Sequence, residues 1–112
     1  MTMDLLSRHC APLPEGSSPL EGEALDHYTA ALGDPWQVVD GHHLEGTFEF
    51  DDFQGALDFT NRAGKIAEAE EHHPEITLTW GQATVKIWTH SIGGLSENDF
   101  ILAARIGTLE EG

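Results

Sequence analysis

Residues 76–88 read Ile-Thr-Leu-Thr-Trp-Gly-Gln-Ala-Thr-Val-Lys-Ile-Trp, and this stretch predicts a β-hairpin. Apolar residues alternate with threonine up to Trp80, which is the two-residue period of a strand. Gly81-Gln82 fits a two-residue turn with glycine in the first central position. After the turn, Val85 and Ile87 share one face of a second strand. The other face then carries Thr84, Lys86, Trp88 and His90.

A helix is predicted on the N-terminal side of this hairpin, over about residues 53–71. One apolar stripe runs along it, formed by Phe53, Ala56, Leu57, Thr60, Ala63, Ile66 and Ala67. Asp51-Asp52 can cap its start, and the helix should end before Pro74.

The first part of the chain predicts another helix and another hairpin. Ser18 is the expected cap with Pro19 in the first turn, and apolar residues then recur at helical spacing up to the stop at Gly33. Residues 36–39 and 44–50 are the two strand candidates. Asp40-Gly41 between them is a hairpin signal.

The last part of the chain predicts a third helix. Gly93-Gly94 breaks the preceding strand, and Ser96 with Asp99 resembles a capping box at the helix start. The order α-β-β-α-β-β-α favours an α+β fold, with a four-stranded, mainly antiparallel sheet packed on helices. We expect one domain over residues 18–112 and an irregular, loosely docked arm over residues 1–17. An edge strand of such a sheet would be exposed unless a second copy covered it.

Composition narrows the function classes. The chain has 112 residues, with 20 Asp and Glu against 5 Lys and Arg, for a formal net charge of −15. Such a surface repels phosphate backbones and anionic membranes, so we expect no direct nucleic-acid binding and no membrane partner. Cys10 is the single cysteine, which fits a reducing compartment. With an acid at Asp4 where a secretion signal carries basic residues, we expect a cytoplasmic protein.

Candidate chemical groups gather around the exit of the second helix. Glu68 and His72 are four residues apart, so on a helix the carboxylate could contact and orient the imidazole. His73 and Pro74 follow at the helix exit, and His90 stands at a predicted strand end, where functional residues are common. Taken alone, Glu68 and His72 read more readily as a helix-surface pair.

Two other chemistries are weaker. Glu68, His72, His73 and His90 are acceptable zinc ligands by type and number, but adjacent histidines usually point apart and no cysteine pair supports a metal site. Nucleophilic catalysis has no serine in a recognisable elbow, and Cys10 lies in the arm. The remaining histidines are interpreted as surface or packing residues: His9, His27, His42 and His43.

The run Glu68-Ala-Glu-Glu-His-His-Pro-Glu75 resembles the signature of the pterin-4a-carbinolamine dehydratase family. In that pattern an acidic residue precedes the His-His-Pro group and an aromatic residue follows, as Trp80 does here. His90 and Asp99 complete it at permitted spacing. The resemblance covers roughly residues 18–107.

The resemblance implies an antiparallel sheet packed on helices, dimers or tetramers, and dehydration of a 4a-hydroxytetrahydropterin without metal or bound cofactor. By position, His72 and His90 would be the acid/base groups, Glu68 would orient His72, and His73 would bind the pterin with some share in proton transfer. Pro74 and Asp99 would help to bind substrate, although Asp99 is also explained by the charge preference of a helix start.

The main rival to catalysis is an interaction role. The same resemblance includes a dimerisation cofactor of a transcription factor and an assembly factor of the carbon-fixing carboxylase. The assembly branch departs from the catalytic pattern, whereas this chain keeps Glu68, His72, His73 and His90 together. That retention favours enzymatic activity, but it does not exclude a binding role, because the transcriptional branch of the family also keeps these residues.

Overall fold

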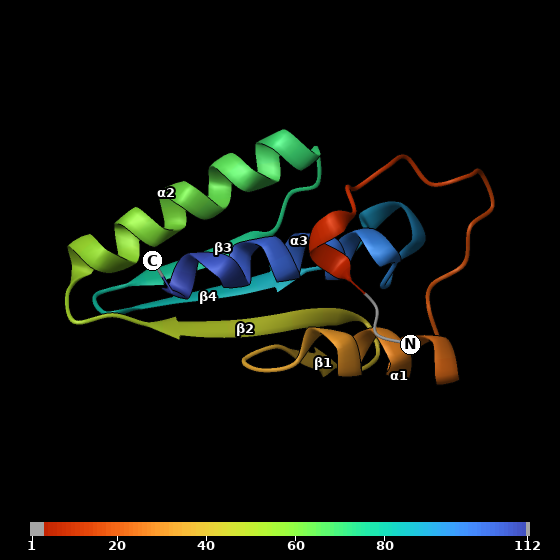
Figure 1. The fold of residues 1–112 in the computed structure, drawn as a ribbon, viewed down its shortest axis with the longest axis horizontal. Helices are drawn as coiled ribbons and strands as arrows, with labels where there is room; N and C mark the ends of the chain where they lie inside the picture. Colours follow the sequence, from red (N-terminus) through yellow and green to blue (C-terminus); the bar gives the residue numbers. More distant parts are fainter. Residues whose placement is uncertain (1–3, 112) are drawn as a thin grey trace.

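A computed structural model describes residues 4–111 of the chain (Figure 1). Residues 1–3 of the predicted arm and Gly112 lie outside this range. Three helices, four strands and three short 3-10 turns follow one another: η1 (Leu5–Ser7), α1 (Gly22–Leu32), β1 (Gln37–Val39), β2 (His43–Glu49), α2 (Phe53–Glu70), β3 (Glu75–Thr79), β4 (Gln82–Ile87), η2 (His90–Ile92), α3 (Glu97–Gly107) and η3 (Thr108–Glu111). The predicted class and element order are confirmed.

The four strands form one antiparallel sheet in the order β1-β2-β4-β3. Strands β2 and β4 are central, and β1 and β3 form the edges. Alternate residues of β4 are buried, with Val85 and Ile87 on the core face as predicted. Helix α2 packs along β3 and β4, with α3 beside it (Figure 1).

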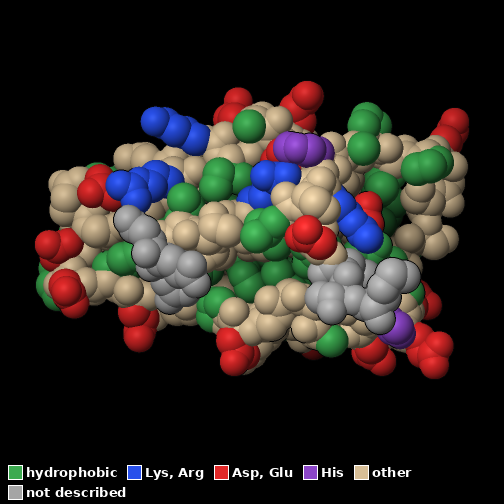
Figure 2. Space-filling model, in the orientation of Figure 1, with side chains coloured by type: hydrophobic (Ala, Val, Ile, Leu, Met, Phe, Trp, Pro, Cys, Tyr) green, Lys and Arg blue, Asp and Glu red, His purple; other side chains and the backbone are tan. Residues whose placement is uncertain are grey.

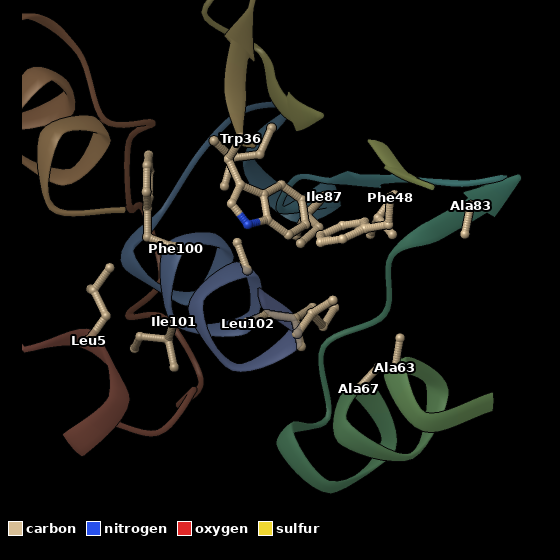
Figure 3. Packing of buried hydrophobic residues seen from close by; sticks show 14 of the residues in the cluster. Leu5, Trp36, Phe48, Ala63, Ala67, Ala83, Ile87, Phe100, Ile101 and Leu102 are labelled. Atoms are coloured by element: carbon tan, nitrogen blue, oxygen red, sulfur yellow. The ribbon is translucent and has the colours of Figure 1, made fainter. Parts of the chain in front are cut away.

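The core lies between the sheet and these two helices (Figure 3). The Phe48 ring meets Trp36 edge-on at a centroid distance of 5.6 Å and Phe59 at 4.5 Å. Helix α3 contributes an almost continuously buried run over residues 100–103, while α2 contributes small residues such as Ala63 and Ala67. The small side chains let α2 approach the sheet closely, which fixes where its C-terminal end lies.

Most predicted boundaries are confirmed. Gly33 ends α1, and Asp40 and Gly41 both take the positive φ angles, 55° and 64°, that a tight hairpin turn requires. The Asp52 side chain caps α2 by accepting a hydrogen bond from the Gly55 N–H at 2.7 Å. Within the described chain, no helix is long and apolar enough to cross a membrane.

The predicted start of the first helix is wrong. Helix α1 begins at Gly22 with Glu21 as its N-cap, and not at Ser18-Pro19. The reason is a tertiary contact: the Leu20 N–H donates to the Leu95 carbonyl at 2.8 Å, and Pro19 packs against Gly94. These contacts hold residues 18–20 in a non-helical conformation despite the local helix signal.

The predicted turn of the second hairpin is one residue out of register. Thr79 pairs with Gln82, so the two turn residues are Trp80-Gly81 and not Gly81-Gln82. Gly81 lies against the loop between β2 and α2, where its carbonyl accepts from the Phe50 N–H at 2.8 Å. Trp80 is therefore at the hairpin tip, 70% exposed. His90 is also displaced from its predicted strand end, because β4 stops at Ile87 and His90 begins η2.

A pair of glycine substitutions tests this packing. A Cβ on Gly46 in β2 would lie 2.7 Å from the Trp36 ring, so Gly46→Ala should destabilise the fold by about 1–3 kcal/mol. The matched control is Gly64→Ala in α2, where a Cβ meets nothing within 4 Å and should stabilise by roughly 0.5–1 kcal/mol. Urea unfolding at one protein concentration measures both. Equal midpoints for the two variants would contradict the packing.

Candidate active site

The end of α2 decides which way His72 points. Glu71 adopts the left-handed conformation (φ 54°, ψ 38°) as the C-cap, and the His72 N–H bonds back to the Ala67 carbonyl at 3.1 Å. This turn directs His72 towards the interior, with its side chain 14% exposed. Its Nε2 then lies 2.5 Å from the Asp99 Oδ1 on the first turn of α3.

Asp99 is fully buried and is satisfied from three directions. Besides His72, its Oδ2 accepts from the Thr89 hydroxyl at 2.9 Å and from the Ser96 N–H at 2.8 Å. The second of these bonds is half of the capping box predicted from Ser96 and Asp99, which is confirmed. Asp99 therefore contacts His72 from the interior, and its side chain is not exposed to solvent.

The donor and the acceptor of each hydrogen bond around Asp99 follow from which groups carry a hydrogen. The Thr89 hydroxyl gives its proton to Asp99, so the Ser96 hydroxyl, 2.7 Å away, must donate to Thr89. An ionised carboxylate only accepts, so the His72 Nε2 carries a proton towards Asp99. The His72 Nδ1 is therefore the ring nitrogen that Asp99 does not engage.

A depression of about 270 Å³ collects the predicted histidines. Its lining residues are Glu71, His72, His73, Trp88, Thr89, His90 and Ser91. The His90 ring stacks on Trp88, with centroids 4.5 Å apart and planes 10° apart. The three histidines that the signature singled out thus line one hollow, although His90 comes from a different segment than His72 and His73. We call it the histidine hollow.

Glu68 does not make the predicted contact with His72. Its Oε1 instead lies 2.5 Å from the His73 Nε2, and both side chains are well exposed, at 78% and 63%. The i, i+4 argument fails because α2 ends at Glu70, so His72 no longer follows the helical spacing. Pro74 follows, half-buried, before β3.

The zinc arrangement considered from the sequence is not formed. In the part of the chain that the structure describes, no three His, Cys, Asp or Glu side chains are placed to hold one metal ion. Glu68 and His73 pair at the surface, while His72 is turned inwards to Asp99.

Sequence reasoning missed two groups of residues. Thr89 continues the core face of Val85 and Ile87 at a two-residue period, and a core-facing threonine needs a hydrogen-bond partner, so its role could have been found. His42 and His43 surround Trp88 at centroid distances of 5.3 and 6.0 Å. The pairing of Leu44 with Ile87 brings them there, and because α2 and β3 separate these two strands in the sequence, no hairpin signal indicates it.

The N-terminal arm, residues 4–17 of the described chain, is tied down beside the site. The Glu70 carboxylate accepts from the Cys10 N–H at 2.7 Å and contacts the His9 Nδ1 at 2.9 Å. The Asn98 side chain exchanges two hydrogen bonds with the Ala11 backbone, at 3.0 and 2.8 Å. Leu5 is buried in the core. Residues 5–11 are therefore held by specific contacts, contrary to the expected loose docking.

Glu70 is the charged anchor of this arm. Burial acts to raise its pKa, but hydrogen bonds from Cys10 and His9 and the charge of Arg105 outweigh burial and lower the pKa below its ordinary 4.5. The contact between Glu70 and the arm therefore adds stability above pH 4.5, and this stability is lost as the pH falls through the lowered pKa of Glu70.

Between the arm and His72 lies a second hollow of about 450 Å³, which we call the arm hollow.

Comparison with known proteins places this geometry in context. The family model described as pterin 4 alpha carbinolamine dehydratase matches residues 18–109. A relative from Chlorobium limicola is 51% identical over 92% of this chain and 93% of its own length. A relative from Rubrobacter xylanophilus is 44% identical over 95% of this chain and 98% of its own. Both bear the name "Putative pterin-4-alpha-carbinolamine dehydratase".

A solved structure shares the fold. The crystal structure of a transcriptional coactivator/pterin dehydratase from Brucella melitensis superposes with a TM-score of 0.77 at 32% identity. It covers 83% of this chain and 99% of its own. The match with the family model begins at Ser18, so the arm lies outside it.

The environment of Cys10 makes a chemical prediction. Burial, followed by the negative charge of Glu70, raises the pKa of the Cys10 thiol to about 12. Alkylation by iodoacetamide at pH 8 should thus be more than about 100-fold slower than for a free thiol, because the thiolate is scarce. The urea-unfolded protein, whose thiol titrates normally, is the control. Equal rates before and after unfolding would show that the arm is not docked as described.

Proposed function

The chain belongs to the pterin-4a-carbinolamine dehydratase family, and we propose that it dehydrates 4a-hydroxytetrahydrobiopterin or a related pterin to the quinonoid dihydropterin. Such an activity recycles the pterin consumed by aromatic amino acid hydroxylases. The observation that carries the proposal is the buried Asp99, which contacts the Nε2 of His72, while the histidine itself lines a hollow that His90 also lines.

The reaction needs two proton transfers and no change of oxidation state. The C4a–O bond breaks as an acid protonates the departing hydroxyl, which leaves as water, and a base removes a proton from the ring system. Imidazole can serve either step near neutral pH. We assign these steps to His72 and His90, with His73 and Pro74 positioning the pterin. The chemistry requires neither a metal nor a bound cofactor.

Asp99 is assigned a positioning role in this scheme. Its carboxylate fixes the ring plane and the tautomer of His72, as a buried acid commonly does for a catalytic histidine. Glu68 pairs with His73 at the surface, where solvent weakens the interaction. His72 is therefore held more firmly by Asp99 than His73 is held by Glu68.

The same proposal covers partners and location. A neutral pterin is not repelled by a net charge of −15, whereas nucleic acids and anionic membranes are. We propose a cytoplasmic homodimer or homotetramer in which a second copy covers an exposed sheet edge, β1 or β3.

An interaction role is the second candidate, because the Brucella melitensis structure carries both a coactivator and a dehydratase description. An assembly or coactivator protein needs no acid/base pair. The ordered support of His72 by a buried carboxylate is unexplained under that reading.

Activity is the direct test. The purified protein should accelerate dehydration of a 4a-hydroxytetrahydropterin, followed by absorbance, and His72→Ala combined with His90→Ala should lower kcat by at least about 100-fold. Circular dichroism shows whether the variant keeps its fold. Equal rates for wild type and the double variant would sink the catalytic assignment, and stoichiometric capture of one partner by an inactive protein would favour the interaction role.

A comparison of two carboxylates tests the positioning role. Asp99→Asn replaces one acceptor oxygen with a donor, so the carboxamide cannot serve His72, Thr89 and Ser96 together, and kcat should fall by about 100-fold with an altered pH profile. Glu68→Gln removes an exposed contact and should change kcat less than about fivefold. Equal losses from both substitutions would contradict the unequal roles.

A further inference from the structure

We propose that the arm hollow is a second subsite, which receives the ring substituent of the pterin and selects a neutral, hydroxylated one. The inference rests on the proposed function and deepens it. It assigns a role to residues 9–13 of the arm and to the adjoining surface of α2, neither of which enters the chemistry above.

The two hollows are continuous around His72. Glu71, His72, Thr89 and Ser91 line both of them. The histidine hollow has a volume of about 270 Å³, just below the roughly 300–1,000 Å³ that small-molecule sites usually provide. Because the same residues line both hollows, a substituent on a substrate whose reacting carbon lies at His72 can reach the arm hollow. The arm hollow, at about 450 Å³, opens directly from the same histidine.

The outer wall of the arm hollow is ordered. Cys10 and Ala11 are fixed by hydrogen bonds to Glu70 and Asn98. The Cys10 thiol also donates to the Asn98 carbonyl at 3.3 Å. Glu70 is two residues before His72, and Asn98 immediately precedes Asp99. The wall is thus attached within two residues of each member of the His72–Asp99 pair, which sets its distance from that pair.

The lining determines what kind of substituent fits. Ala11, Pro12, Leu13 and Ala69 offer contacts for carbon atoms, and the Ser91 hydroxyl can donate or accept a hydrogen bond. Glu70 and Glu71 are the acidic lining residues, and no Lys or Arg lines this hollow in the described chain. Hydroxyl groups can donate to the Glu71 carboxylate, whereas the Glu70 carboxylate, 7% exposed, already accepts from Cys10 and contacts His9. A carboxylate or phosphate would meet the like charge of Glu71, whereas His9 and Arg105 already partly offset the charge of Glu70.

A bulky substitution in the arm hollow tests this subsite separately from the proton-transfer steps. Ala69→Phe places a ring in the arm hollow from the exposed face of α2, and Ala30→Phe on exposed α1, away from both hollows, is the matched control. The substrates are 4a-hydroxytetrahydropterins bearing a methyl, a dihydroxypropyl or a carboxyl group on the same ring carbon. The readout is kcat/KM for each substrate.

Wild type should favour the dihydroxypropyl substrate over the methyl and carboxyl substrates by roughly tenfold or more. Ala69→Phe should remove most of that advantage and leave the methyl substrate within about twofold, while Ala30→Phe should change neither. Leu13→Trp narrows the same hollow from the arm and repeats the test if Ala69→Phe fails to fold.

An unchanged substrate ratio in the blocked variants, or an equal loss for all three substrates, overturns the subsite while the dehydratase assignment stands. A wild-type preference for the carboxyl substrate also overturns it. Wild-type protein that is inactive with all three substrates overturns both proposals together. Wild-type activity with the methyl substrate therefore distinguishes a failure of the subsite proposal from a failure of the dehydratase assignment.

Discussion

The buried carboxylate of Asp99 is the constraint on which the rest of the site depends. A charged group with no solvent access is tolerated only when hydrogen bonds replace its water. Its donors are His72 beyond α2, Thr89 beyond β4 and Ser96 at the start of α3. One carboxylate thus joins three chain segments, and it lies at a helix N-terminus, where negative charge is favoured.

The acidic character of the protein has little influence on this centre. Asp and Glu side chains are spread around the outline of the face shown in Figure 2, where solvent and salt weaken their fields. Asp99 is fully buried and the His72 side chain is 14% exposed, so solvent weakens the contact between them far less than it weakens the surface charges. A strongly acidic surface and a precisely arranged acid/base centre are therefore compatible.

Several local signals were read correctly from the sequence, although the Gly81-Gln82 turn and the Glu68–His72 pair were not, and the long-range contacts could not be read from it. The Asp52 cap, the Asp40-Gly41 turn and the Ser96–Asp99 box each depend on residues within a few positions of one another. The His72–Asp99 contact joins residues 27 positions apart, and no local pattern encodes it. The early helix start at Ser18-Pro19 failed for the same reason, since Leu95, far along the chain, takes the Leu20 N–H.

Composition gave a misleading account of the arm. Pro12, Pro14 and Gly16 do exclude regular structure, but irregular backbone can still be rigid when its polar groups find partners. Here those partners are Glu70 and Asn98, which lie close in the sequence to His72 and Asp99 respectively. A shift of either α2 or α3 would disturb the arm and the His72–Asp99 contact at once. The fold therefore couples the position of the arm, which forms the wall of the arm hollow, to the orientation of His72, the proposed acid/base residue. These two features are far apart in the sequence.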